Sequence, residues 1–243
     1  MQGQFKSLVQ GRQHPSILFI GCSDSRLSSY LLTGTGPGEV LMVRNVGAFV
    51  PPHDGYIEGP RDASGVGPTG GRTPPESARR WVGHHGTATA IEFAVLKLNV
   101  LRIKVCGHSH CGGICALYEE PTPHATNLAA WLELGREAML PVQLSPEALR
   151  RTEQRSVVLQ LERLIGYPMV RERVEAGRRV LRGGHYVIED GEVDVFDVRS
   201  GRFAPASSAE HSGTGPFDQT PVDDGGRIFY EIDEALDPAL RVP

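Results

Sequence analysis

The chain has 243 residues and a formal net charge of −4, and 40% of its residues are hydrophobic against 22% charged. This size and balance are typical of a globular protein with one large core. The negative charge argues against a nucleic-acid partner, which normally requires a basic patch, and no apolar run is long enough to span a membrane. The start, MQGQFKSLVQGRQH, lacks the apolar segment of a secretory signal, so we expect a cytoplasmic location.

Three short apolar runs predict strands that are buried on both faces. Each run is continuous rather than alternating, which is typical of parallel strands; they cover residues 16–20, 40–43 and 101–106. The segment TATAIEFAVLKL (87–98) places its apolar residues at helical spacing, with Thr87 or Thr89 as its N-cap. This order of strand, helix and strand predicts a crossover unit and therefore an α/β sheet.

The second half of the chain predicts more helix, followed by an antiparallel piece. A helical region begins near Thr152 and breaks at the sequence Gly-Tyr-Pro (166–168). Residues 185–196 are typical of a hairpin with Asp190 and Gly191 at its turn. The expected fold is α/β, with a mostly parallel central sheet, flanking helices and an antiparallel C-terminal extension of the sheet.

Two segments differ in composition from this framework. Residues 59–75 are more than half glycine and proline, which predicts an insertion on the surface. Residues 206–243 are polar and rich in Ser, Gly, Pro and Asp, which predicts a flexible C-terminal extension. Residues 1–205 are then the folded domain.

Residues capable of chemistry gather after two of the predicted strands. The sequence CSDSR (22–26) follows the first strand, and CGHSHCGGIC (106–115) begins at the end of the third. Because ligands gather at the carboxyl ends of strands in an α/β sheet, we expect Cys22, His108 and Cys111 to meet, and this donor set suits zinc. Taken alone, CSDSR is also compatible with a surface turn that holds a chance ion pair beside a small buried cysteine, and the spacing of His108 and Cys111 is a weak signal of metal binding. Three of the four cysteines lie in one ten-residue window, which makes a disulfide framework an unfavourable alternative.

With these motifs the chain resembles the β-class carbonic anhydrases. The resemblance covers about residues 5–205, the catalytic domain, and its further motifs are VRNVGAFVPP (43–52), HHGTATAIEFAV (84–95), GHSHCGG (107–113), QLERLIGYPMVRE (160–172) and GGHYVIEDGEVDVFD (183–197). It implies zinc-dependent, reversible hydration of carbon dioxide to bicarbonate and a proton, by attack of zinc-bound hydroxide. Two alternatives remain: hydrolysis of carbonyl sulfide or carbon disulfide on the same fold, and a non-enzymatic zinc-binding regulatory module.

The resemblance also implies which residues carry out the reaction. It assigns one zinc ion per chain to Cys22, His108 and Cys111, an acid–base dyad to Asp24 and Arg26, and substrate contacts to Gln13, Leu41, Val46 and Gly112. Two thiolates cancel the charge of zinc, so the metal acidifies its water less than one held by three imidazoles. Asp24, kept ionised by Arg26, is therefore expected to accept a hydrogen bond from that water, and Gln13 to donate one to the developing bicarbonate.

The resemblance leaves two resting states of the site open. In part of the family the aspartate becomes the fourth zinc ligand at lower pH, so Asp24 is a possible ligand in a closed state. Relatives gated by bicarbonate use a Trp–Arg–Tyr trio, and here the tryptophan position is Phe19, although Arg44 is present. We therefore expect the open arrangement, with Asp24 paired to Arg26. Plant-type relatives also carry a tyrosine where this chain has Phe93.

The remaining cysteines and histidines favour structural roles. Cys106 is predicted to face the core, and Cys115 to be packed rather than ligating. His110 is a less favoured ligand candidate. His84 and His85 precede the predicted helix 87–98, where either a solvated helix entry or the transfer of protons to bulk water would suit them.

The family completes its sites across a dimer interface, so the resemblance implies at least a homodimer. Carbon dioxide and bicarbonate are the expected partners, with neither nucleic acid nor membrane. Only 21 residues precede Cys22, so the N-terminal arm that embraces the neighbouring subunit is expected to be short or absent. Assembly beyond the dimer is therefore in doubt.

Overall fold

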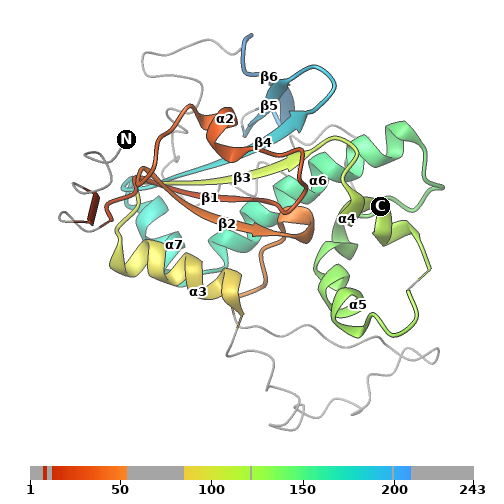
Figure 1. Cartoon of the computed structure of the whole chain (residues 1–243), viewed down its shortest axis with the longest axis horizontal. Helices are drawn as coiled ribbons and strands as arrows, with labels where there is room; N and C mark the ends of the chain where they lie inside the picture. The colour runs from red at the N-terminus through yellow and green to blue at the C-terminus, as the bar shows by residue number, and fades with distance from the viewer. Residues whose placement is uncertain (1–7, 10–12, 54–84, 121, 199, 209–243) are drawn as a thin grey trace, which may run out of the picture.

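The computed structural model describes residues 8–9, 13–53, 85–120, 122–198 and 200–208. Within these ranges, six strands form a single sheet in the order β2-β1-β3-β4-β5-β6 (Figure 1). The strands are β1 (Ile17–Cys22), β2 (Val40–Asn45), β3 (Arg102–His108), β4 (Val180–Val187), β5 (Glu192–Asp197) and β6 (Arg202–Pro205). β2, β1, β3 and β4 run parallel, whereas β5 and β6 are antiparallel additions at one edge. The expected α/β fold is confirmed.

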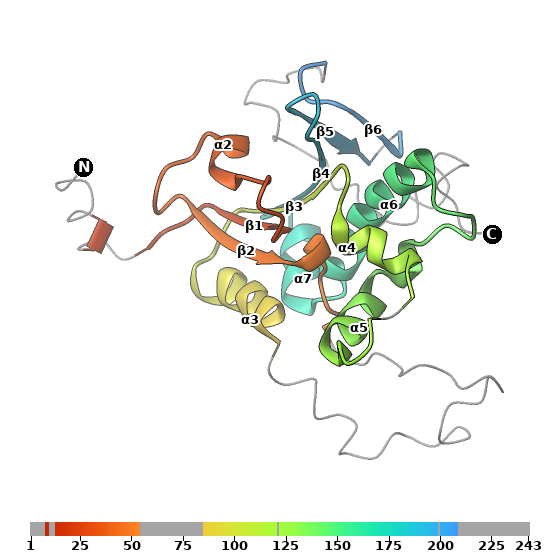
Figure 2. The same ribbon diagram turned by 45° about the vertical axis from the view of Figure 1, so that its right-hand side comes forward.

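Helices cover the two faces of the sheet unequally. They are α2 (Ser29–Thr33), α3 (Gly86–Glu92), α4 (Gly112–Cys115), α5 (Thr126–Leu132), α6 (Pro146–Ile165) and α7 (Pro168–Glu175), with the short turns η1 (Val46–Ala48), η4 (Ala116–Tyr118) and η5 (Glu133–Ala138) and the π-helix η3 (Phe93–Lys97). Figures 1 and 2 show α2 on one side of the parallel strands and α3 and α7 on the other. None of the helices in the described ranges is both long and apolar enough to cross a membrane.

The main core lies between the sheet and the helices α3, α6 and α7. Leu18 and Ile20 of β1 and Ile103 and Val105 of β3 pack there, all almost fully buried. The opposite face carries a smaller cluster that includes Phe19, against which Leu32 of α2 packs. Burial on both faces explains why the parallel strands read as continuous apolar runs.

Several boundaries differ from the sequence expectation. Helix α6 begins at Pro146 rather than near Thr152, because Ser145 caps it by accepting the Ala148 N–H and Pro146 occupies the first turn. His85, not Thr87 or Thr89, is the N-cap of α3. The helix predicted to end at Leu98 closes with the π-helical turn η3.

The C-terminal part of the sheet is longer than expected. The expected hairpin is present, with Gly191 at its turn in a left-handed conformation (φ 67°). However, its first strand, β4, begins at Val180 and pairs in parallel with β3, and β6 adds a strand that was not predicted. The predicted insertion 59–75 and the extension from residue 209 onward lie outside the described residues.

Two glycines let α6 lie close to the sheet. A Cβ atom on Gly107 of β3 would stand 2.8 Å from Val157 Cγ2, and one on Gly183 of β4 would stand 2.8 Å from Val157 Cγ1. Such distances lie inside van der Waals contact, so a larger residue at either position would push the helix outward. This close contact sets the position of α6 relative to the ends of β3 and β4.

The contact predicts that Gly183→Ala destabilises the fold. Overpacking against Val157 should lower the free energy of unfolding by about 1–3 kcal/mol, as measured by urea denaturation at a fixed protein concentration. Gly86→Ala is the control, because a Cβ there meets nothing within 4 Å. That control should be neutral or stabilising by up to about 1 kcal/mol. Equal midpoints for Gly183→Ala and the unmodified protein would show that α6 is free to move.

Candidate metal centre

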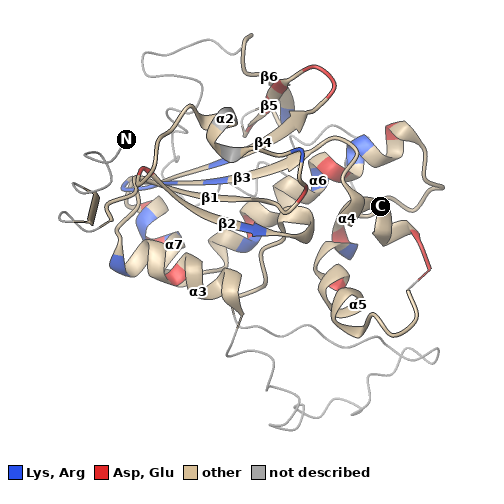
Figure 3. Ribbon diagram, in the orientation of Figure 1, with Lys and Arg blue, Asp and Glu red and all other residues tan. Residues whose placement is uncertain are grey.

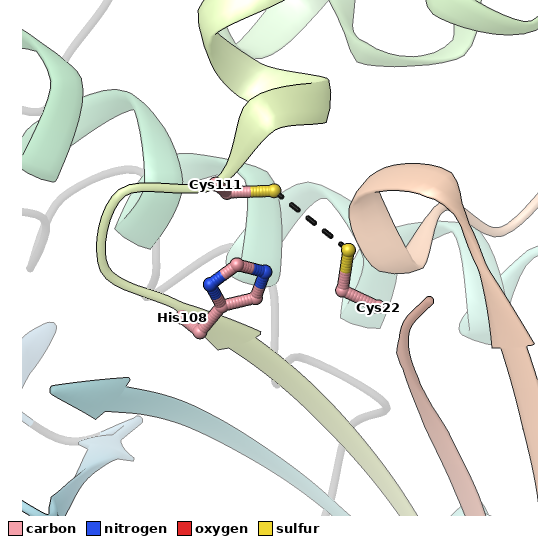
Figure 4. A group of neighbouring side chains, drawn as sticks. All are labelled: Cys22, His108 and Cys111. Carbon is pink, nitrogen blue, oxygen red and sulfur yellow. Dashed lines mark hydrogen bonds between the residues drawn. The ribbon is translucent and has the colours of Figure 1, made fainter. Parts of the chain in front are cut away.

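Three potential metal ligands meet at the carboxyl ends of two adjacent strands. Cys22 is the last residue of β1 and His108 the last residue of β3, and these strands are neighbours in the sheet. Cys111 follows as the N-cap residue of α4. Between His108 and Cys111 the chain turns at His110, which adopts a left-handed conformation (φ 55°). Figure 4 shows the three side chains gathered at one place from these two strand ends and the start of the helix.

The spacing of the donor atoms fits a tetrahedral metal ion. Cys22 Sγ and Cys111 Sγ lie 3.9 Å apart, and one donor atom from each of Cys22, His108 and Cys111 lies within 4.8 Å of the others. Zn–S bonds of about 2.3 Å at a tetrahedral angle place two sulfurs about 3.8 Å apart. The two thiols are therefore already at the separation that zinc requires.

The imidazole of His108 presents its Nε2 to the two sulfurs. His108 Nδ1 lies 2.9 Å from the carbonyl oxygen of Ser109, and since a carbonyl only accepts, the proton sits on Nδ1. Nε2 is buried and has no hydrogen-bond partner among the described residues. A buried nitrogen lone pair without a donor is costly unless a cation occupies the position in front of it. The residues present therefore fit zinc.

The thiols of Cys22 and Cys111 shift each other's pKa in opposite directions. The hydrogen bond with the Cys111 thiol lowers the pKa of Cys22 to about 4, against the opposing effect of burial. The same hydrogen bond, together with burial, raises the pKa of Cys111. The first sulfur to ionise therefore opposes ionisation of the other as long as no cation lies between them. Binding of a divalent cation through both thiolates releases protons from the pair.

Asp24 lies beside the three ligands and is paired with Arg26. Arg26 donates from Nε to Asp24 Oδ1 (2.9 Å) and from Nη2 to Oδ2 (2.7 Å), and its backbone N–H also bonds Oδ1. The hydrogen bonds from Arg26 hold the pKa of Asp24 well below its usual range. Asp24 Oδ2 is 3.7 Å from His108 Nε2. An ionised oxygen thus borders the ligand set.

Further hydrogen bonds fix the loop that carries the dyad. Arg26 Nη2 also donates to the His110 carbonyl (2.9 Å). Arg44 of β2 donates to the backbone carbonyls of Cys22 (3.0 Å) and Asp24 (2.6 Å). The position of Asp24 is therefore fixed by arginines from two different segments.

Two of the predicted substrate residues lie next to the ligands. Val46 begins η1, directly after Asn45, which is paired with Cys22 across the sheet, and its side chain is 39% exposed. Gly112 follows Cys111 directly and is exposed, and a Cβ added there would meet nothing within 4 Å. Both positions therefore border open space beside the ligand set.

The other two predicted substrate residues lie elsewhere in the chain. Gln13 is exposed and precedes β1, so it lies toward the opposite end of that strand from Cys22. Leu41 pairs with Leu18 within the sheet and packs against the main core. A single chain therefore does not bring Gln13 or Leu41 to the metal ligands.

The remaining cysteines and histidines are placed as follows. Cys106 is buried, as expected, and burial raises its pKa to about 12, while Cys115 is half-buried and outside the ligand group. His110 is exposed, 3.6 Å from Glu189. His85 stacks on Trp131 at the start of α3, with ring centroids 5.0 Å apart. His84 lies outside the described residues.

Glu153 of α6 also contacts the ligand set, although it was not among the residues predicted from the sequence. Its Oε1 accepts the backbone N–H of Cys111 at 2.9 Å, and its side chain is almost fully buried. A signal was present: Glu153 lies four residues before Val157 and eight before Leu161, on the apolar stripe of α6. A charged residue at such a position needs a buried partner.

Comparisons with known proteins agree on one family. The family model described as "Carbonic anhydrase" matches residues 17–193. A carbonic anhydrase from Pseudomonas aeruginosa is 36% identical over 217 residues, covering 85% of this chain and 83% of the relative. The structure of the β-carbonic anhydrase CcaA is similar with a TM-score of 0.67 and 28% identity, over 84% of this chain and 89% of the other. Tetrameric β-carbonic anhydrases from Sordaria macrospora give a TM-score of 0.60 at 26% identity, over 79% and 86% of the two chains.

The geometry predicts which side chains hold the metal. Purified protein should contain about one zinc per chain, because the donors form a single tetrahedral set. Cys22→Ser, His108→Ala and Cys111→Ser should each lose it, as measured by elemental analysis after dialysis.

Cys115→Ser and His110→Asn are the controls for this experiment and should retain the metal, because neither side chain lies in the donor set and asparagine tolerates the left-handed backbone at position 110. Full zinc occupancy in Cys111→Ser would contradict the ligand assignment.

Proposed function

The chain belongs to the β-class carbonic anhydrases, enzymes that hydrate carbon dioxide to bicarbonate, and we propose that it does so with one zinc ion held by Cys22, His108 and Cys111. The observation that carries this proposal is the buried set of two thiols and one imidazole with an ionised carboxylate beside it. A purely structural zinc site would normally be closed by a fourth protein ligand. Here the neighbouring carboxylate, Asp24, is bonded to Arg26 instead.

The bound zinc would supply a Lewis acid that lowers the pKa of a water molecule. Asp24 supplies the acceptor for that water: its Oδ2 is ionised and borders His108 Nε2. By accepting one hydrogen bond it would orient the lone pair of the water toward carbon dioxide. Arg26 fixes this oxygen and keeps the carboxyl group ionised. In this mechanism Asp24 orients the water, and Arg26 holds Asp24 in place and ionised.

The same pairing supports an open resting site. Both oxygens of Asp24 are engaged by Arg26, and the backbone carbonyl of Asp24 is bound by Arg44. To become a fourth ligand, Asp24 would have to give up a bidentate, charge-assisted pairing. We therefore propose that water rather than Asp24 completes the donor set above neutral pH.

Carbon dioxide is apolar, so its binding needs an apolar surface beside the dyad. Val46 provides such a surface, and Gly112 leaves the space next to Cys111 open because it has no side chain. Neither Val46 nor Gly112 has a side chain that can donate a hydrogen bond to the bicarbonate that forms, so another residue has to do so. Gln13 can supply it only from a second copy of the chain, because its own β1 separates it from its own site.

We therefore propose at least a homodimer in which each chain contributes Gln13 to the site of the other. β2 is an edge strand of the sheet, and the nearby turn η3 exposes Phe93 (43%) and Leu96 (51%). An edge strand and exposed apolar side chains each favour association with another chain. The tetrameric Sordaria relatives support self-association in this family.

The cytoplasmic location inferred from the sequence stays a prediction.

One test of the proposed mechanism concerns the dyad of Asp24 and Arg26. Asp24→Asn preserves the shape of the side chain but removes the charge that orients the water, so the zinc content should stay full while turnover falls roughly 100-fold or more. Stopped-flow carbon dioxide hydration on zinc-loaded protein measures this effect, and carbonyl sulfide should be assayed in parallel as the alternative substrate. Unchanged hydration by Asp24→Asn would remove Asp24 from the mechanism.

Another test asks which chain supplies the Gln13 side chain to each site. Gln13→Ala and Cys111→Ser should each be nearly inactive alone, the first because a donor to bicarbonate is missing and the second because zinc is lost. Mixed dimers of the two should regain activity, because one of their two sites then combines an intact zinc set with the partner's Gln13.

Co-expression with two affinity tags isolates the mixed dimer for the hydration assay. If Gln13 instead acted within its own chain, both sites of the mixed dimer would be defective and no activity would return.

A further inference from the structure

A buried acid–histidine pair lies directly behind the metal ligands. His185 Nε2 of β4 and Glu153 Oε2 of α6 are 3.1 Å apart, and their side chains are 0% and 2% exposed. The other carboxylate oxygen, Glu153 Oε1, accepts the backbone N–H of Cys111 at 2.9 Å. One carboxylate thus joins a strand, the long helix and a proposed zinc ligand.

This position is unusual for a charged residue of α6. The helix carries charges of both signs along its length (Figure 3), and its acidic residues Glu147 and Glu162 are exposed or half-exposed. Glu153 alone among the acidic residues of α6 is buried against the sheet. Burying a carboxylate is expensive unless each of its oxygens is bonded, and the partners here are Cys111 and His185.

The chain is built to bring Glu153 to this place. Gly107 and Gly183 have no side chain, so Val157, one turn after Glu153, can approach both β3 and β4. Without this close approach, Glu153 would not reach the Cys111 amide at the end of β3. The glycine of the GHSHCGG motif that precedes His108 therefore contributes to the position of Cys111.

The bond from Glu153 acts on the residue from which the metal-binding sulfur projects. Cys111 is the N-cap of α4, in extended conformation (φ −71°, ψ 115°), and no side chain caps this helix. Its carbonyl is bonded within the turn by the N–H groups of Ile114 and Cys115. The Glu153 bond holds its N–H, so both backbone polar groups of Cys111 are fixed.

We propose that Glu153 and His185 are positioning residues for the metal site: through the Cys111 amide they hold its sulfur in place against loss of the metal. The proposal rests on the zinc site proposed above. Glu153 makes the contact with Cys111, and His185 fixes the direction in which the Glu153 carboxylate points. Partners outside the ligand set typically change metal affinity or activity by about 10–100-fold.

The test compares two buried side chains of α6 that each accept a backbone amide. Gln160 Oε1 accepts the Val50 N–H at 2.8 Å, and Gln160 is 0% exposed. Glu153→Leu and Gln160→Leu therefore each remove a buried acceptor of a backbone N–H, but only Glu153 is bonded to a proposed metal ligand. Both variants should lose thermal stability, whereas only Glu153→Leu should alter the metal site.

The main measurement is the rate at which zinc passes from the full-length protein to a chromophoric chelator. We expect Glu153→Leu to release zinc roughly 10–100-fold faster than the unmodified protein, and Gln160→Leu to release it at the unmodified rate. Glu153→Gln keeps an oxygen for the Cys111 amide, so it should restore slow release. In the cobalt-substituted proteins, the thiolate-to-cobalt absorption should change in Glu153→Leu and stay unchanged in Gln160→Leu.

His185→Gln provides a second test if Glu153→Leu does not fold. It leaves Glu153 in place but removes the imidazole that orients it, so zinc release should again be faster than in Gln160→Leu. Equal release from the folded variants and from Gln160→Leu would overturn the positioning role. If the unmodified protein binds no zinc, or binds zinc without hydrating carbon dioxide, the proposed function fails instead, and the two failures are distinct.

Discussion

Adjacent parallel strands end at the same edge of a sheet, and the site depends on this constraint. β1 and β3 are such neighbours, so Cys22 and His108 meet although they are far apart in the sequence. Cys111 then needs only a tight turn from β3 into α4 to join them. All three ligands thus belong to regular elements or their ends, and the donor set is as rigid as the sheet that carries it.

The charges of the site are divided between its interior and its rim. Cys22, His108 and Cys111 are buried, whereas the side chains of Asp24 and Arg26 are 15% and 47% exposed. Groups that bind a cation gain from burial, because water does not compete for them. In the proposed reaction the dyad handles protons, and its partial exposure lets it communicate with solvent.

The parts of the fold that follow from local sequence were predictable, and those that depend on partners were not. The runs leading to β1 and β3 are apolar and each precedes a motif, so the meeting of Cys22, His108 and Cys111 could be predicted from pattern alone. Residues 180–184 of β4 carry little strand signal because they include Arg182, Gly183 and Gly184. Their place is set by pairing with β3 and, at Gly183, by packing against α6. The early start of α6 had a local signal, the Ser-Pro-Glu sequence at residues 145–147, and was overlooked.

The site shows the same division. The sequence identifies Gln13 as a residue type suited to the reaction, but it does not say in which chain that residue acts. The proposal that it acts in the partner chain rests on the direction of β1, which places Gln13 and Cys22 toward opposite ends of one strand. Glu153 escaped notice for a related reason: its importance lies in a contact with Cys111, 42 residues away in the chain.

The left-handed backbone at His110 has a consequence for the evolution and engineering of the protein. The turn uses the main chain of His110, since its carbonyl accepts a bond from Arg26. The imidazole is directed outward, and 62% of it is exposed. The backbone of residue 110 therefore forms the turn, and its side chain takes no part in it. Any residue that tolerates the left-handed region, such as asparagine or glycine, keeps the turn. Its side chain can then be exchanged to alter the surface charge beside Glu189 while the ligands stay in place.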